Sequence, residues 1–233
     1  MFQAIVKAFG QLSDPATRRI LWRSLVATTA LFLLLVFGAE WLIAHTHLFE
    51  RAMFDWVAKL LGGLLAFGLA LYLFPSAVLI VLGFFIEEVA ALVEARHYPG
   101  LPPPRAQSWS EVIWAGLRFA LVAVGLNLLA LPFVAALSFV PPLNVLLFYV
   151  LNGYLLGREY FELVALRRLA PRDAKALRQA YAGRFLLAGA AITFLSTVPV
   201  VNLLTPVVAT AFMVHIVESL RESVIASQGG APR

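Results

Sequence analysis

Long unbroken apolar runs dominate the chain and predict helices that cross a membrane. The first run covers 20–39, about 30 Å of helix, which matches the hydrocarbon thickness of a bilayer. The second covers 60–85, where Pro75 is expected to introduce a kink. Two further apolar regions cover 117–157 and 185–217. A membrane β-barrel would instead alternate apolar and polar residues in segments of about ten, so the pattern favours an all-α integral membrane protein.

Amphipathic segments accompany these runs. Residues 1–12 place apolar side chains on one helical face, which is typical of a helix lying in the membrane interface. Asp14 and Pro15 are favoured at a helix N-cap and first turn, so the next helix is expected to begin there. A second amphipathic helix carries Glu87 and Glu88. With a C-terminal tail at 226–233, the whole chain, 1–233, is interpreted as a single membrane domain.

The two late apolar regions contain an internal repeat. Leu-Ser-Phe-Val-Pro-Pro-Leu-Asn-Val-Leu at 137–146 matches Leu-Ser-Thr-Val-Pro-Val-Val-Asn-Leu-Leu at 195–204 in six of ten positions, at an offset of 58. Each copy lies in the middle of its region, where Pro and Asn favour a turn. Both regions are therefore predicted to be helical hairpins with uncharged tips. Internal repeats are common in membrane transporters.

The arm lengths indicate how deeply each hairpin enters the membrane. In the second hairpin, the arms at 185–198 and 203–217 extend only about 21–23 Å as helices, short of the ~30 Å hydrocarbon core. We therefore expect half-penetrating helices with tips inside the membrane. In the first hairpin the leading arm, 119–140, is long enough to span, so full crossing remains the alternative there.

The composition supports a membrane protein and limits its chemistry. Hydrophobic residues make up 61% of the chain and charged residues 13%, against about a quarter charged in soluble domains. The absence of cysteine excludes disulfides and thiolate catalysis. The net charge of +5 comes without a basic stripe interleaved with aromatics, which argues against nucleic acid as a partner.

The distribution of basic residues predicts the orientation. Between the first two spans, only Arg51 and Lys59 occur, and the other 16 of the 18 basic residues fall on the opposite side. The positive-inside rule then places both termini in the cytoplasm and 50–59 outside.

A candidate anion site lies at the start of the first long helix. Free backbone N–H groups at Ala16 and Thr17 and the positive end of the helix dipole favour an anion. Arg18 and Arg19 add guanidinium groups that bind oxyanions in bidentate fashion. The alternative is that both arginines are interfacial anchors.

Further residues are candidates for an anion pathway. Arg118, Arg158 and Arg184 lie at the cytoplasmic ends of hairpin arms and could line a vestibule, or could simply extend toward the interface. Asn144 and Asn202 lie at the hairpin tips and could line a pore, with hydrogen bonding between helices as the alternative.

The sequence offers no basis for an enzyme, a metal or a cofactor. Its four histidines, His45, His47, His97 and His215, have no metal-ligand spacing. No ionisable side chain lies deep in a predicted arm, and no Ser–His pairing is apparent.

Three segments resemble the bacterial CysZ sulfate permease family. They are the run Val-Pro-Val-Val-Asn-Leu-Leu-Thr-Pro-Val-Val-Ala-Thr-Ala at 198–211, the aromatic-rich 154–162, and Pro-Ala-Thr-Arg-Arg at 15–19, where the family has Gly-x-Arg-Arg and this chain has Ala16. The resemblance implies two spans and two half-penetrating hairpins, assembled as a homo-oligomer in the bacterial inner membrane. It also implies sulfate uptake for cysteine synthesis. A non-transporting scaffold or regulatory protein of the same fold is the alternative function.

Overall fold

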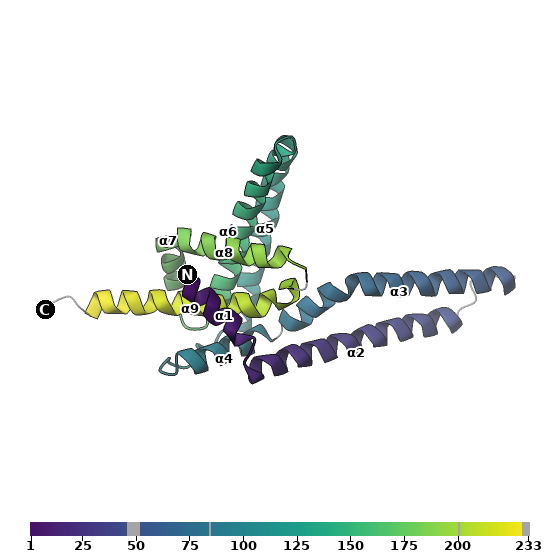
Figure 1. Ribbon diagram of the computed structural model, residues 1–233, viewed down its shortest axis with the longest axis horizontal. Helices are drawn as coiled ribbons and strands as arrows, with labels where there is room; N and C mark the ends of the chain where they lie inside the picture. Colours follow the sequence, from purple (N-terminus) through teal and green to yellow (C-terminus); the bar gives the residue numbers. More distant parts are fainter. Residues whose placement is uncertain (46–51, 84, 200, 230–233) are drawn as a thin grey trace. The chain divides into compact units, whose positions relative to one another are not determined.

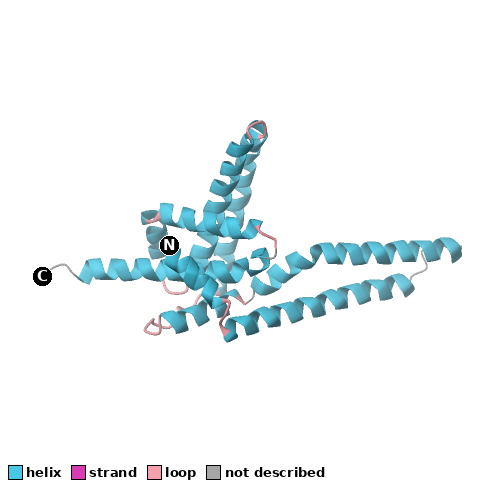
Figure 2. Ribbon diagram, in the orientation of Figure 1, coloured by secondary structure: helices cyan, strands magenta, loops and turns pink. Residues whose placement is uncertain are grey.

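The computed structural model describes residues 1–45, 52–83, 85–199 and 201–229, and every regular element in these ranges is a helix (Figure 2). The all-α prediction is therefore confirmed for this part of the chain. The helices are α1 (Phe2–Gln11), α2 (Pro15–His45), α3 (Ala52–Gly83), α4 (Ile86–His97), α5 (Trp109–Leu137), α6 (Pro141–Ala165), α7 (Pro171–Ala180), α8 (Ala182–Thr197) and α9 (Val201–Gly229) (Figure 1).

Several of these helices have the length and composition of membrane spans. Among the described residues, four qualify, Pro15–Leu42, Asp55–Phe74, Trp109–Leu137 and Val201–Arg221. The bent pair α7 and α8, whose axes meet at 88°, would make a fifth. The chain folds as two compact units, one of residues 13–88 and one of residues 1–12 with 89–233.

The unit of residues 13–88 is a pair of long helices, α2 and α3, packed along each other (Figure 1). Phe32 on α2 contacts two rings on α3, with centroids 6.4 Å from Phe67 and 5.4 Å from Phe74. α3 begins at Ala52, so most of the polar stretch 50–59 is helical, and residues 46–51 lie outside the described part. Many large apolar side chains of both helices are exposed, which suits a lipid environment.

The core of the other unit is the crossing of α6 and α8. The ring centroids of Phe161 on α6 and Phe185 on α8 are 4.4 Å apart, and both residues are buried. α9 packs against both helices and is buried almost continuously from Thr205 to Glu218. α1 packs on α9 (Figure 1).

The repeated motif coincides with the two chain reversals of this unit. In the first copy, α5 ends at Leu137 and α6 begins at Pro141. In the second, α8 ends at Thr197 and α9 begins at Val201. Short connections at Pro-containing segments follow because proline ends one helix and is tolerated in the first turn of the next.

The arms of the two hairpins differ in length. α5 has 29 residues and α6 has 25, about 43 and 37 Å, so both could cross a bilayer. α8 has 16 residues, about 24 Å, which is too short to cross alone. α9 passes Val217, where the sequence placed the end of this arm, and reaches Gly229. The predicted tail, 226–233, therefore begins inside α9.

Candidate anion sites

The N-terminus of α2 forms as expected around Asp14. The Asp14 Oδ1 atom accepts a hydrogen bond from the Ala16 N–H at 2.8 Å, and its carbonyl accepts one from the Arg18 N–H at 2.9 Å. The expectation of a free N–H at Ala16 is therefore wrong, because the Asp14 carboxylate already binds it. Thr17 is buried, whereas the side chains of Arg18 and Arg19 are exposed.

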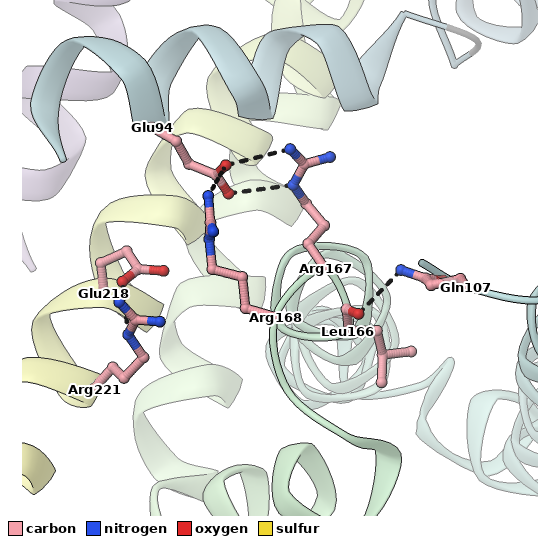
Figure 3. Close-up of polar contacts among 7 residues, drawn as sticks. All are labelled: Glu94, Gln107, Leu166, Arg167, Arg168, Glu218 and Arg221. Atoms are coloured by element: carbon pink, nitrogen blue, oxygen red, sulfur yellow. Dashed lines mark hydrogen bonds and ion pairs between the residues drawn. The ribbon is translucent and has the colours of Figure 1, made fainter. Parts of the chain in front are cut away.

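A buried cluster of charged residues joins α4 to the turn after α6. The Glu94 carboxylate accepts from Arg167 through Nε and Nη2, both at 3.2 Å, and from Arg168 Nη2 at 2.7 Å (Figure 3). On α9, Arg221 Nε lies 3.1 Å from Glu218 Oε2 (Figure 3). The side chains of Arg167 and Arg168 are 8% and 9% exposed, so one carboxylate holds two desolvated guanidinium groups.

Sequence reasoning missed this cluster because its partners are 73 and 74 residues apart. A local signal did exist. Val89, Ala90 and Val93 mark the buried face of α4, and Glu94 falls on that face by helical spacing. A carboxylate on a buried helical face requires a cationic partner.

The predicted vestibule arginines have three different environments. Arg158 is 4% exposed, its Nε donates to Glu162 Oε1 at 2.8 Å, and its Nη2 has no hydrogen-bond partner among the described residues. Its guanidinium carbon lies 6.0 Å from the Phe119 ring centroid. Arg118 lines a cavity with Glu162, the partner of Arg158, so Arg118 and Arg158 lie at the same end of the first hairpin. Arg184 is exposed and lies over the Tyr181 ring at 5.4 Å.

A larger cavity, of about 390 Å³ and open to the outside, lies between α5 and α6 in the first hairpin. Asn127, Asn144 and Asn152 line it together with apolar side chains. The amide groups of Asn127 and Asn152 donate to carbonyls four residues earlier on their own helices, at 2.8 and 2.9 Å. Asn144 thus lines the same cavity as Asn127 and Asn152, while Asn202 lies at the separate tip between α8 and α9.

Two of the four histidines meet. The ring centroids of His97 and His215 are 4.8 Å apart in an edge-to-face arrangement. The Tyr98 hydroxyl oxygen lies 3.0 Å from His215 Nδ1. In the described part of the chain, no three histidine or acidic side chains converge as metal ligands would.

The structure is that of a helical, multi-pass membrane protein. Several of its helices have the length of a membrane span and expose apolar side chains, and buried arginines lie among them. Residues 4–206 match the family described as sulfate transporter CysZ/etoposide-induced protein 2.4, and the chain belongs to that family. The resemblance seen in the sequence is thus confirmed. No curated protein matches the chain. The family includes CysZ sulfate transporters and etoposide-induced proteins, so membership alone does not identify a substrate.

Proposed function

We propose that this protein is a membrane permease for sulfate or a related oxyanion, supplying sulfur for cysteine synthesis. The observation that carries the proposal is a surplus of buried positive charge around α6. The side chains of Arg158, Arg167 and Arg168 are each at least nine-tenths buried. Their carboxylate partners are Glu94 and Glu162, so three guanidinium groups face two carboxylates.

Such a surplus favours an anionic ligand. A buried charge without a partner is costly, and an anion removes that cost when it binds. Arg168 Nε and Nη1 and Arg158 Nη2 have no hydrogen-bond partner among the described residues, so donors remain for a ligand. The planar guanidinium group suits the tetrahedral oxyanions, which accept two parallel hydrogen bonds.

The remaining predicted residues would each contribute to anion capture within their own unit. Arg18 and Arg19 would attract the anion at the start of α2, assisted by the helix dipole. Arg118 and Arg184 would raise the anion concentration at the mouths of the hairpins. Asn144 and Asn202 would contact a partly dehydrated anion near the tips.

The proposed setting is a homo-oligomer in the bacterial inner membrane, with both termini cytoplasmic and α2 and α3 as full spans. The tip of the second hairpin would lie inside the membrane, consistent with the 24 Å estimated for α8, and the longer α9 would continue from that tip past the membrane surface. Non-helical backbone at that depth must lie within protein or line a water-filled cavity, and a pore meets that condition.

Uptake of radiolabelled sulfate into liposomes tests the function directly. Wild-type protein should give saturable uptake. Arg168→Gln should reduce uptake at least tenfold, because a hydrogen bond to a charged group contributes about 1.5–3 kcal/mol. Arg172→Gln is the matched control, since Arg172 is an exposed arginine on α7. Arg168→Lys retains the charge and shows whether loss of bidentate geometry alone reduces uptake.

The opposite results would favour the non-transporting alternative. Wild-type uptake no faster than in empty liposomes would contradict a permease. If Arg168→Gln folds and transports as well as Arg172→Gln, the buried cluster serves only to hold α4 against the turn after α6.

A further inference from the structure

A second cationic site, which Arg158, Arg167 and Arg168 do not line, lies in a cavity of about 100 Å³ between α5, α6 and α7. One liquid water fills about 30 Å³, so the cavity accommodates a group of a few heavy atoms and not a large ligand. Its charged lining consists of Glu111, Arg118, Glu162, Lys175 and Arg178.

Both carboxylates of this lining are neutralised by arginines outside it. Glu111 accepts from Arg105 through Nη1 at 3.0 Å and also through Nη2. Glu162 accepts from Arg158 Nε at 2.8 Å. The three lining cations, by contrast, make no hydrogen bond or ion pair within the described residues. The cavity therefore presents three uncompensated positive charges.

The surroundings of the cavity are those of a membrane interface. Trp109 and Trp114, in the first two turns of α5, are 84% and 64% exposed, and tryptophan concentrates where headgroups meet hydrocarbon. Trp114 also lines the cavity. Leu117 and Leu121 follow on the same helical face as Trp114 and Arg118, and both leucines are exposed. An apolar strip thus leads from the cavity toward the hydrocarbon.

We propose that this cavity binds the phosphate of an anionic phospholipid, with the acyl chains lying along the exposed face of α5. Arg118, Lys175 and Arg178 attract the phosphate and compensate its charge. The adjacent apolar strip distinguishes the site from one for a soluble anion, because a free oxyanion gains nothing from Leu117 and Leu121. Basic pockets beside membrane helices bind anionic headgroups in this manner. Arg118 is shared with the proposed anion path, so the test uses Lys175 and Arg178, to which the permease proposal assigns no role.

Binding of fluorescent phosphatidylglycerol to the purified full-length protein in micelles, followed by anisotropy, tests the site. Phosphatidylcholine with the same label is the reference lipid. The wild type should bind phosphatidylglycerol more tightly. Lys175→Gln and Arg178→Gln should each weaken that binding about fivefold, because each cation near a membrane surface contributes about 1 kcal/mol. Arg172→Gln should not, since Arg172 is exposed on the same helix but does not line the cavity.

Three outcomes would overturn the assignment. In the first, the two lipids bind the wild type equally well. In the second, Arg172→Gln weakens phosphatidylglycerol binding as much as Lys175→Gln does, which would indicate general attraction to the basic surface. In the third, inorganic phosphate or sulfate at the lipid's half-saturating concentration would displace the lipid, and the cavity would be a soluble-oxyanion site. None of these measurements depends on transport, so the lipid site and the permease can fail separately.

Discussion

Gly189 on α8 lies against the backbone of Gly153 on α6, so closely that a Cβ atom at Gly189 would overlap the carbonyl oxygen of Gly153. Gly157 makes a similar approach to the Phe185 carbonyl. Small residues allow membrane helices to approach at backbone distance, and this crossing holds the core of the larger unit together.

Gly189→Ala should therefore destabilise the protein. Overpacking a tight contact costs roughly 1–3 kcal/mol, which exceeds the gain of up to about 1 kcal/mol in helix propensity. Gly183→Ala is the control on the same helix, because a Cβ there meets open space. Thermal unfolding in detergent should show a lower midpoint for Gly189→Ala and an equal or higher one for Gly183→Ala. Equal midpoints would mean that α6 and α8 do not cross at these glycines.

Glu94 offers a test of the buried arginine cluster. Glu94→Gln removes the carboxylate that both Arg167 and Arg168 contact, and breaking a buried pair costs about 3–5 kcal/mol. The two arginines then lack an anion, so added sulfate should raise the melting temperature more in Glu94→Gln than in wild type. Sodium chloride at matched ionic strength controls for screening, and Glu87→Gln is the exposed control on α4. A sulfate effect no larger than in Glu87→Gln would contradict an anion site at this cluster.

Asp14 should weaken anion binding at the start of α2, because its carboxylate already accepts from the Ala16 N–H. Asp14→Ser retains a capping oxygen and removes the negative charge, so sulfate should bind more tightly. Arg18→Ala and Arg19→Ala should each weaken binding roughly 10- to 150-fold. Calorimetric titration of sulfate into these variants, with Arg23→Ala as control, measures the effect. Affinities that do not differ among them would leave Arg18 and Arg19 as interfacial anchors.

The features that could be predicted from the sequence are those set by neighbouring residues. Apolar runs of span length predict α2, α3 and α5, and Asp14 with Pro15 predicts the start of α2. The repeated Pro- and Asn-containing motif predicts both chain reversals. In each case the signal extends over about one helix, and local propensities together with the length of the apolar run are sufficient.

The contacts that could not be predicted join residues far apart in the chain. Tyr98 and His215 are 117 residues apart, and Glu94 and Arg167 are 73 apart. A single sequence carries no signal for such pairs beyond the presence of polar residues on buried faces. The end of α9 was also placed too early. The apolar run stops at Val217, but the next residue, Glu218, pairs with Arg221 and the helix continues to Gly229.

The depth of the hairpin tips can be measured by cysteine labelling, which is direct because the chain has no native cysteine. α8 is about 24 Å long, less than the ~30 Å hydrocarbon core, so its tip should end inside the membrane. Asn202→Cys and Asn144→Cys should both react slowly with a membrane-impermeant thiol reagent added outside intact cells. Because α5 and α6 are long enough to cross, rapid labelling at Asn144→Cys alone would indicate that only the first hairpin spans.

Trp56→Cys, in the segment predicted to be external, should label rapidly, and Ser108→Cys only after the membrane is permeabilised. Rapid external labelling at both asparagine positions would show two full hairpins and remove the reason for a buried tip.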